Sequence, residues 1–197
     1  MSLPRHPEKA VFFTGLLFSD NAVFHDILPY LTNQFGDVLY QSRVLDWTHT
    51  SYYDKELGAP IFRNFIFFDS VIDPYSLTRA KLETTKLETL FAVDGKRRIN
   101  IDPGYLTLAK VVLASLKNYS HRIYLGSSVY AELELFYKDG RFNSMPYTYY
   151  DYKDEATINI FTEARSRFRK IAPQGSPSFL AGLNNEAVPG LKGPAED

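Results

Sequence analysis

Residues 10–18 read AVFFTGLLF, and this unbroken apolar run decides the fold. It has the length of a strand and is rich in aromatic residues, which is typical of a central strand buried on both faces. The chain of 197 residues is 45% hydrophobic and 23% charged, which is enough for one domain with a full core. We expect that domain at 10–172, between a flexible N-terminus at 1–9 and a flexible tail, rich in proline and glycine, at 173–197.

The segment after this run has the pattern of an amphipathic helix. Asp20 can cap it, and apolar residues recur at three- and four-residue spacing through 23–35, ahead of Gly36. Pro29 lies inside this stripe, so we expect a kink or a break there. Residues 38–47 then read as a second strand.

The same order of elements follows once more. A loop is expected at 48–60 and a strand at 61–68, and Asp73-Pro74 then begins a second helix. Residues 98–101 return as a strand. The order β-α-β-β-α-β is that of the ferredoxin-like split βαβ arrangement, in which two helices cover one face of an antiparallel sheet. The predicted fold class is therefore α+β.

Residues 105–116 fit either a helix or a strand, and the run Val111-Val112-Leu113 favours a strand. Strands are expected next at 121–125, 129–138 and 141–145. Asp139-Gly140 between the last two is a strong hairpin signal. A final helix capped near Asp154 completes the domain, so C-terminal hairpins and one helix extend the ferredoxin-like core.

Composition narrows the function classes. The absence of cysteine removes disulfides, thiolate metal sites and cysteine nucleophiles, and it favours a cytoplasmic location. A net charge of −1 indicates no excess of positive charge of the kind that binds nucleic acids or anionic membranes. The run at 10–18 is too short to span a bilayer and lacks the flanks of a signal peptide. No phosphate-loop, dinucleotide, zinc-protease or hydrolase-elbow motif is present.

The segment 94–102 holds the most suggestive cluster of charge. Lys96, Arg97 and Arg98 follow a glycine, and Asp102-Pro103-Gly104 predicts a turn. Guanidinium groups beside a turn with free N–H groups suit a phosphate or a carboxylate. The alternative is a solvated basic corner between a helix and a strand.

His121 and Arg122 form a second candidate, because histidine transfers protons near neutral pH and arginine orients anions. On a strand these neighbours would point to opposite faces, so we do not expect them to face the same ligand. The alternative is a structural histidine at the start of a strand.

Glu132 and Glu134 lie two residues apart on a predicted strand and so share a face. With Asp102 or His121 they could hold Mg²⁺, which needs only one or two carboxylates plus waters. No other cofactor is evident. The alternative is the polar, exposed face of an antiparallel strand.

A dense group of tyrosines at 147–152 includes Tyr149, whose ring could stack on a base or a sugar. The lack of net positive charge argues against a nucleic-acid partner. The alternative is that these rings pack against the sheet edge where the chain enters the last helix.

The segments 94–105 (DGKRRINIDPGY) and 120–132 (SHRIYLGSSVYAE) resemble a bacterial family named domain of unknown function 4416. The stretches FFTGLLFSD and MPYTYYDY and the segment Tyr52-Tyr53-x-x-Glu56-Leu57-Gly58 are similar too, so the resemblance covers about residues 10–170. In the loop THTSYYDKELG the family tends to carry an acidic residue in place of Ser51. The resemblance implies a compact bacterial cytosolic domain and no particular reaction.

Three hypotheses for the function follow. The first is a binding module for a small anionic ligand, phosphorylated or carboxylate, with the ligand-binding residues Lys96, Arg97, Arg98, Asp102, Tyr105, Arg122 and Tyr149. The second is a metal-dependent enzyme on a phosphorylated substrate or nucleotide, with His121 and Glu132 as catalytic residues and Asp102 and Glu132 as Mg²⁺ ligands. The third is a homo-oligomeric interaction protein.

Overall fold

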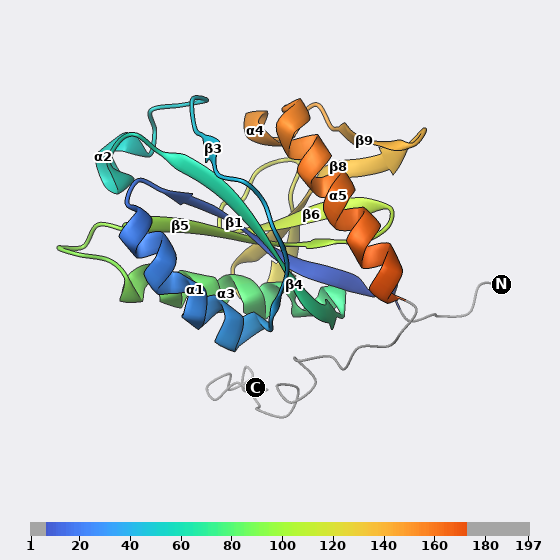
Figure 1. Cartoon of the computed structure of the whole chain (residues 1–197), viewed down its shortest axis with the longest axis horizontal. Helices are drawn as coiled ribbons and strands as arrows, with labels where there is room; N and C mark the ends of the chain where they lie inside the picture. The colour runs from blue at the N-terminus through green and yellow to red at the C-terminus, as the bar shows by residue number, and fades with distance from the viewer. Residues whose placement is uncertain (1–6, 173–197) are drawn as a thin grey trace, which may run out of the picture.

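The computed structural model describes residues 7–172, so the segments 1–6 and 173–197 of the predicted flexible ends lie outside the described residues. The α+β prediction is confirmed within this range: nine strands form one antiparallel sheet, which is larger than the predicted core. The sheet order is β2-β4-β1-β5-β6-β8-β7, with β3 paired to β4 and β9 to β8 (Figure 1). The strands are β1 (Ala10–Phe18), β2 (Val38–Gln41), β3 (Leu45–Asp46), β4 (Phe62–Ile72), β5 (Ile99–Leu106), β6 (Lys110–Ser115), β7 (Ile123–Gly126), β8 (Val129–Lys138) and β9 (Arg141–Ser144).

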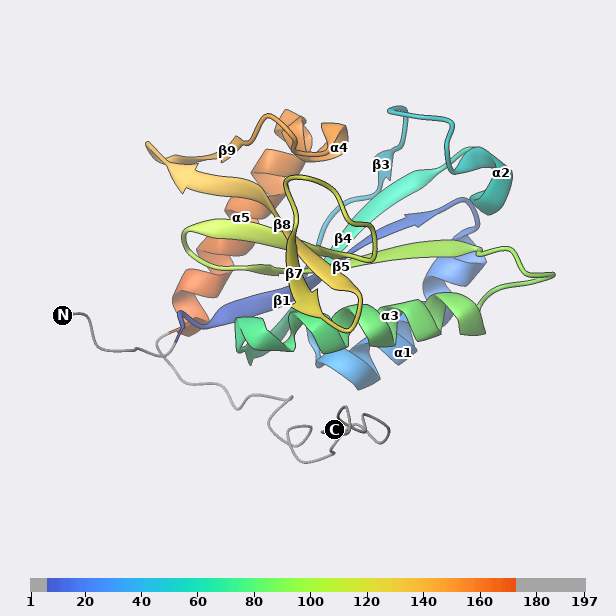
Figure 2. The same cartoon turned by 180° about the vertical axis from the view of Figure 1, so that it is seen from behind.

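The helices form a layer on each side of this sheet. They are α1 (Asn21–Phe35), α2 (Asp54–Leu57), α3 (Leu77–Leu90), α4 (Tyr150–Lys153) and α5 (Glu155–Ile171), with a 3₁₀ turn at Pro74–Ser76. The α1 and α3 helices lie together below the sheet, and α5 crosses its other face (Figure 1). Seen from behind, β7 and β8 lie above α3 (Figure 2).

The first strand lies at the centre of this arrangement, as predicted. β1 pairs with β4 on one side and β5 on the other, and all nine of its residues are buried. Its alternate side chains point towards the two helix layers. Phe12 packs in the apolar cluster between the sheet and α1, whereas Phe13 contacts Phe161 of α5 at 5.0 Å between ring centroids. Apolar residues therefore occupy most positions of β1, because both faces are covered; the buried Thr14 is the polar exception.

Two predicted elements differ in the structure. The α1 helix continues through Pro29 without a break, because Pro29 and His25 are both exposed and water can reach the carbonyl that loses its partner. The strand predicted at 38–47 is divided into β2 and β3. Between them the Ser42 hydroxyl accepts from the Phe65 N–H at 2.9 Å, which replaces regular side-by-side pairing.

The loop predicted at 48–60 also contains the short helix α2. The predictions of strand for the ambiguous 105–116 segment and of a hairpin at Asp139-Gly140 are confirmed by β6 and by the β8–β9 pair. The last helix begins after Asp154, as expected. Among the described helices, none is both long and apolar enough to cross a membrane.

The turn predicted at Asp102-Pro103-Gly104 is wrong, because β5 runs straight through these residues. β6 pairs only with the C-terminal part of β5, at 104–106, and then leaves it. Along the rest of β5 the Ile101 N–H donates to Glu88 of α3 at 2.6 Å. Pro103 lies two residues further on and turns its nitrogen to the same side, where no ladder bond is required of it.

Candidate functional site

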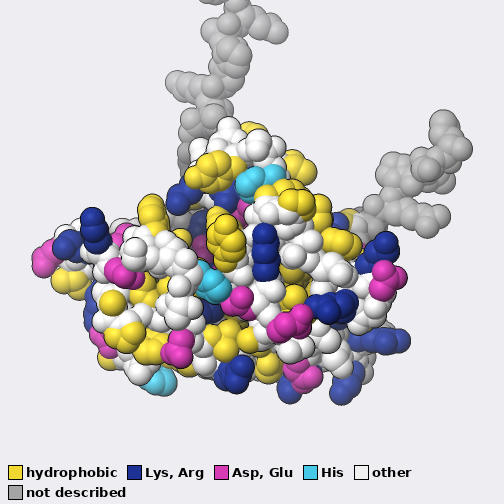
Figure 3. Space-filling model, turned by 90° about the horizontal axis from the view of Figure 1, so that it is seen from above, with side chains coloured by type: hydrophobic (Ala, Val, Ile, Leu, Met, Phe, Trp, Pro, Cys, Tyr) yellow, Lys and Arg dark blue, Asp and Glu magenta, His cyan; other side chains and the backbone are white. Residues whose placement is uncertain are grey.

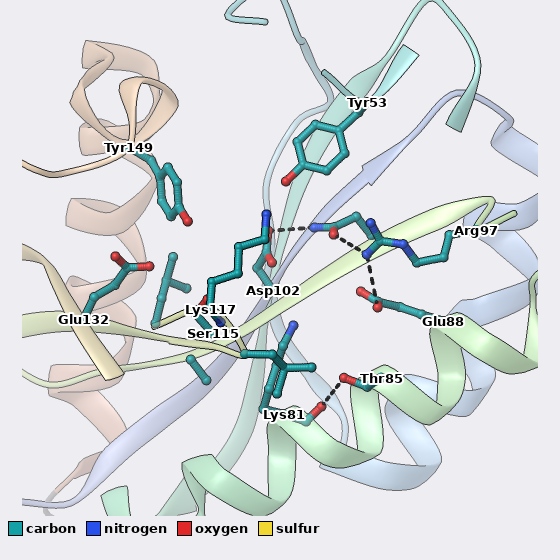
Figure 4. Close-up of a pocket in the computed structure, with 14 residues that line it drawn as sticks. Tyr53, Lys81, Thr85, Glu88, Arg97, Asp102, Ser115, Lys117, Glu132 and Tyr149 are labelled. Carbon is teal, nitrogen blue, oxygen red and sulfur yellow. Dashed lines mark hydrogen bonds and ion pairs between the residues drawn. The ribbon is translucent and has the colours of Figure 1, made fainter. Parts of the chain in front are cut away.

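A pocket of about 150 Å³ lies where β5 and β6 separate. Its walls come from α3, β5, β6, β8, the segment after β6, and the residues just before α2 and α4. The close-up shows that most of the labelled side chains around it are polar or charged (Figure 4). Some of these side chains form hydrogen bonds or ion pairs with neighbouring residues, and others remain available to a ligand.

Arg97 holds together the wall formed by α3 and the start of β5. Its Nε and Nη2 donate to the two Glu56 carboxylate oxygens at 2.7 Å each, and Nη1 donates to Asn100 at 2.9 Å and to Glu88 at 3.3 Å. The hydrogen bonds from Arg97 lower the pKa of Glu56. Burial raises the pKa of Glu88 despite the nearby cations Lys81 and Arg97. All the acceptors in this wall therefore have donors.

Asp102 lies at the base of the pocket between two donors. The Asn100 amide donates to its Oδ2 at 2.8 Å, and Nη1 of Arg63 lies 3.6 Å from the same oxygen. Arg63 is buried and donates through Nη2 to the buried Asp151 at 2.6 Å. Nε and Nη1 of Arg63 have no hydrogen-bond partner in the described chain. The Asp102 carboxylate thus compensates part of a buried positive charge.

Glu132 of β8 forms the opposite wall. Arg122 donates to both its oxygens, at 3.0 and 2.9 Å, and Nε2 of His121 lies 2.9 Å from Oε2. Nη2 of Arg122 also donates to the Tyr149 hydroxyl at 2.5 Å. The expectation that His121 and Arg122 point to opposite faces is wrong, because β7 begins only at Ile123 and the strand alternation does not apply to them.

Glu134 lies behind this wall. It shares a face with Glu132 as expected, and its Oε2 accepts from the Tyr149 N–H at 3.1 Å. The alternative of an exposed polar face is wrong, since both glutamates are buried. Burial, with the nearby charge of Glu132, raises the pKa of Glu134 to about 9, so this carboxyl is neutral at pH 7.

Several donors that line the pocket have no acceptor. Lys117 has its Nζ 5.2 Å from the Tyr52 ring centroid and forms no ion pair within residues 7–172. Lys81 uses one proton, on the Ile101 carbonyl at 3.2 Å. The Tyr53 and Tyr149 hydroxyls stand on opposite sides and point inward (Figure 4), and neither donates to a described residue. Burial raises the pKa of Tyr53 to about 12 and also raises that of Tyr149, so both remain protonated donors.

The residues predicted from the sequence fall into three groups. Arg97, Asp102, Glu132 and Tyr149 line the pocket. His121 and Arg122 lie directly behind Glu132. Three lie elsewhere: Arg98 donates to Asp20 at 2.5 Å, Lys96 is exposed in a turn beside Val93, and Tyr105 packs among apolar side chains. The basic run 96–98 therefore does not converge on one point.

The sequence prediction missed Lys81, Glu88, Tyr53, Ser115 and Lys117, which also line the pocket. Lys81 and Glu88 are seven residues apart, beside the apolar stripe of α3, and both are buried. Charged residues at helical spacing on a buried face are a signal that could have identified them. No group of three or more His, Asp or Glu side chains suited to a metal occurs in the part of the chain that the structure describes.

The surface around the pocket mixes both signs of charge. Viewed from above, lysines and arginines alternate with acidic residues, and hydrophobic side chains gather around a histidine on one side (Figure 3). Exposed tyrosines are frequent: Tyr52 is 66% exposed and Tyr119 is 54% exposed. Exposed aromatic rings therefore accompany the mixed charges on the surface of the molecule.

Comparisons with known proteins agree with the resemblance noted in the sequence. Neither the curated proteins nor the solved structures include a match to this chain. One family model, described as "Domain of unknown function (DUF4416)", matches residues 8–168. The match spans the described fold from just before β1 to the last turns of α5, and it includes all the residues that line the pocket. The chain therefore belongs to the DUF4416 family.

Proposed function

We propose that this protein is a binding module for a small anionic ligand, a phosphate or carboxylate compound, held in the pocket between β5 and β6. One observation carries the proposal: the lining donors Lys117, Tyr53 and Tyr149 have no acceptor among residues 7–172. Polar groups that converge in this way on a concave site are typical of a binding site. An oxyanion would satisfy several of these donors at once.

The carboxylates in the pocket do not oppose an anion as strongly as their number suggests. Glu88 accepts from Arg97 and from the Ile101 N–H, and Glu132 accepts two bonds from Arg122. Asp102 lies 3.6 Å from the buried guanidinium of Arg63. Each of these carboxylates lies beside a cation, although Arg97 also pairs with Glu56 and Arg63 also pairs with Asp151. Of the cations that line the pocket, only Lys117 has a side chain with no hydrogen bond or ion pair within residues 7–172, so its ammonium group is the most available to a ligand.

Calorimetric titration with inorganic phosphate and with citrate tests this site. We expect Lys117→Ala to weaken binding by tenfold or more, because a charge-assisted bond is lost. Lys96→Ala removes the same charge from an exposed turn outside the pocket, and we expect no change. Loss in Lys96→Ala alone would locate the anion at the basic turn, and equal loss in both variants would show that binding follows net charge and not the pocket; either result contradicts the proposal. No heat with either anion in the unmodified protein would refute the proposal.

A second candidate is a metal-dependent enzyme on a phosphorylated substrate, favoured because Asp102 and Glu132 both line the pocket and His121 contacts Glu132. Mg²⁺ needs only one or two carboxylates plus waters. Release of phosphate from phosphorylated compounds should then require Mg²⁺ and stop in Asp102→Asn. Turnover that is independent of Mg²⁺, or that survives loss of both His121 and Glu132, would exclude this assignment.

We also propose that β1-α1-β2-β4-α3-β5 is a ferredoxin-like split βαβ unit to which β6–β9 were added. The spatial order β2-β4-β1-β5, with antiparallel pairing throughout, supports this relation. The placement of α1 and α3 on one face agrees with it. An experimental structure in which β1 and β4 are not neighbours would contradict it.

A further inference from the structure

We infer that the anion in the pocket is the head group of a larger ligand that carries a planar aromatic ring, as a nucleoside monophosphate does, and that this ring rests on Tyr52 at the mouth. The inference depends on the proposed anion site and names the class of ligand for it. Its basis is the size of the pocket together with the side chains at its rim.

The size of the pocket sets the first constraint. Its volume of about 150 Å³ is well below the roughly 300–1,000 Å³ of pockets that enclose a whole metabolite-sized ligand. Most of the lining groups are charged or polar, and they suit an oxyanion. A ligand that fills this space with its head group must therefore lay the remainder of its structure across the mouth.

The composition of the mouth sets the second constraint. Lys117 links the two regions, since its ammonium group reaches the pocket and lies 5.2 Å from the Tyr52 ring centroid. Tyr52 is 66% exposed, and the ring of Tyr53 holds it edge-on at 5.0 Å between centroids. Because the Lys117 ammonium lies over the Tyr52 ring, an anion bound to Lys117 brings its attached group next to a positioned aromatic side chain.

Tyr149 borders the opposite side of the same mouth and is 44% exposed. Its hydroxyl accepts a hydrogen bond from Arg122, whose guanidinium carbon lies 5.9 Å from the ring centroid, so the position of the ring is fixed. Exposed rings on both sides of an anion site favour a flat, weakly hydrated group over a polyol or an aliphatic chain. Stacking on an aromatic side chain typically raises affinity by about tenfold per base.

Four probes separate the head group from the ring: inorganic phosphate, ribose 5-phosphate, phenyl phosphate and adenosine monophosphate. Calorimetry on the full chain should give adenosine monophosphate and phenyl phosphate at least tenfold lower Kd values than ribose 5-phosphate. A gain with adenosine monophosphate alone would specify a nucleotide, and an equal gain with phenyl phosphate would assign it to any aromatic ring.

The variant Tyr52→Ala should reduce the ratio of adenosine monophosphate affinity to phosphate affinity by about tenfold. Tyr75→Ala removes a tyrosine that is 87% exposed and does not line the pocket, and it should leave that ratio unchanged. If phosphate binds but all four probes have equal Kd values, the inference is wrong and the anion site stands. If no probe binds, the anion site itself is wrong and the inference falls with it.

Discussion

The two halves of β5 show how one strand can serve either a core or a pocket. Residues 104–106 have β1 on one side and β6 on the other, and they contribute to apolar clusters. Residues 99–103 have β1 on one side only. Ile99 and Ile101 still pack in the core, but the side chains of Lys81 and Glu88 bond the free backbone edge. The same strand therefore passes from a sheet interior to the wall of a polar pocket within a few residues.

The difference follows from the need to pair buried backbone groups. The Ile101 N–H and carbonyl lose a strand partner where β6 departs, and a buried unpaired group costs about 1–3 kcal/mol. A helix can supply charged side chains there, whereas another strand would have filled the space. The pocket exists because side chains replace a strand at this edge.

The largest effect is expected for Arg63→Met. Arg63 lies on β4, and its guanidinium is beside Asp102 in the half of β5 that borders the pocket. This change leaves the buried Asp151 carboxylate without its partner at 2.6 Å, so the free energy of unfolding should fall by about 3–5 kcal/mol. Urea denaturation measures it. The control Arg141→Ala removes an exposed pair with Glu155 and should cost less than about 1 kcal/mol. Similar losses in both variants would show that the buried cluster is not specially important.

The next effect tests the half that is paired on both sides. A Cβ atom at Gly104 would lie 2.5 Å from a Phe13 ring carbon and 2.6 Å from the Val112 carbonyl oxygen. Because the second contact is with backbone, Gly104→Ala should lower the free energy of unfolding by about 2–3 kcal/mol. A change below about 0.5 kcal/mol would mean that β5 and β6 are not packed this closely.

The half bordered by side chains is tested by Glu88→Ala. This variant removes the acceptor of the buried Ile101 N–H, and the free energy of unfolding should fall by about 2 kcal/mol. Exchange of the Ile101 amide with solvent should also accelerate. Glu83→Ala on the same helix breaks only a bond to the exposed Lys86, and its cost should stay within about 0.5 kcal/mol.

The smallest effect is the change in the free energy of unfolding over a single pH unit. Glu134 has a pKa of about 9 in the folded protein against an ordinary value of 4.5, so between these values the folded state holds a proton that the unfolded state has lost. The stability that this group contributes is complete below pH 4.5 and declines as the pH rises towards about 9, by at most about 1.4 kcal/mol per pH unit. Glu134→Gln should flatten that slope, as thermal melts at several pH values would show; an unchanged slope would contradict the burial argument.

Local signals predicted much of the fold. Asp20 caps α1 through a bond from the Ala22 N–H at 2.8 Å, and Asp139-Gly140 joins β8 to β9. These outcomes depend on residues close together in the sequence, where backbone preference decides. The turn expected at Pro103 failed because the effect of proline depends on whether a partner strand lies on its nitrogen side. That property belongs to the sheet and not to the local sequence.

The site was predicted only in part for a similar reason. Arg97, Asp102, Glu132 and Tyr149 were identified by chemical type, and the fold brings them around one pocket. Arg63 gave no signal, because an arginine inside an apolar strand becomes informative only when its partner Asp151, 88 residues away, is known. Long-range pairing of this kind requires the tertiary structure.

The hydrogen bonds along the edge of β5 also determine which side of the pocket can change shape when a ligand binds. Two α3 side chains tie that helix to Ile101, and Arg97 fastens the segment after α3 to Glu56 before it reaches β5. We therefore expect the side of the pocket formed by α3 and the start of β5 to be rigid. The facing segment around Lys117 is exposed and joined by few hydrogen bonds, so we expect it to move more easily than the helix side. Adaptation to ligands of different shape should therefore be confined to the segment between β6 and β7, while the helix side keeps its geometry.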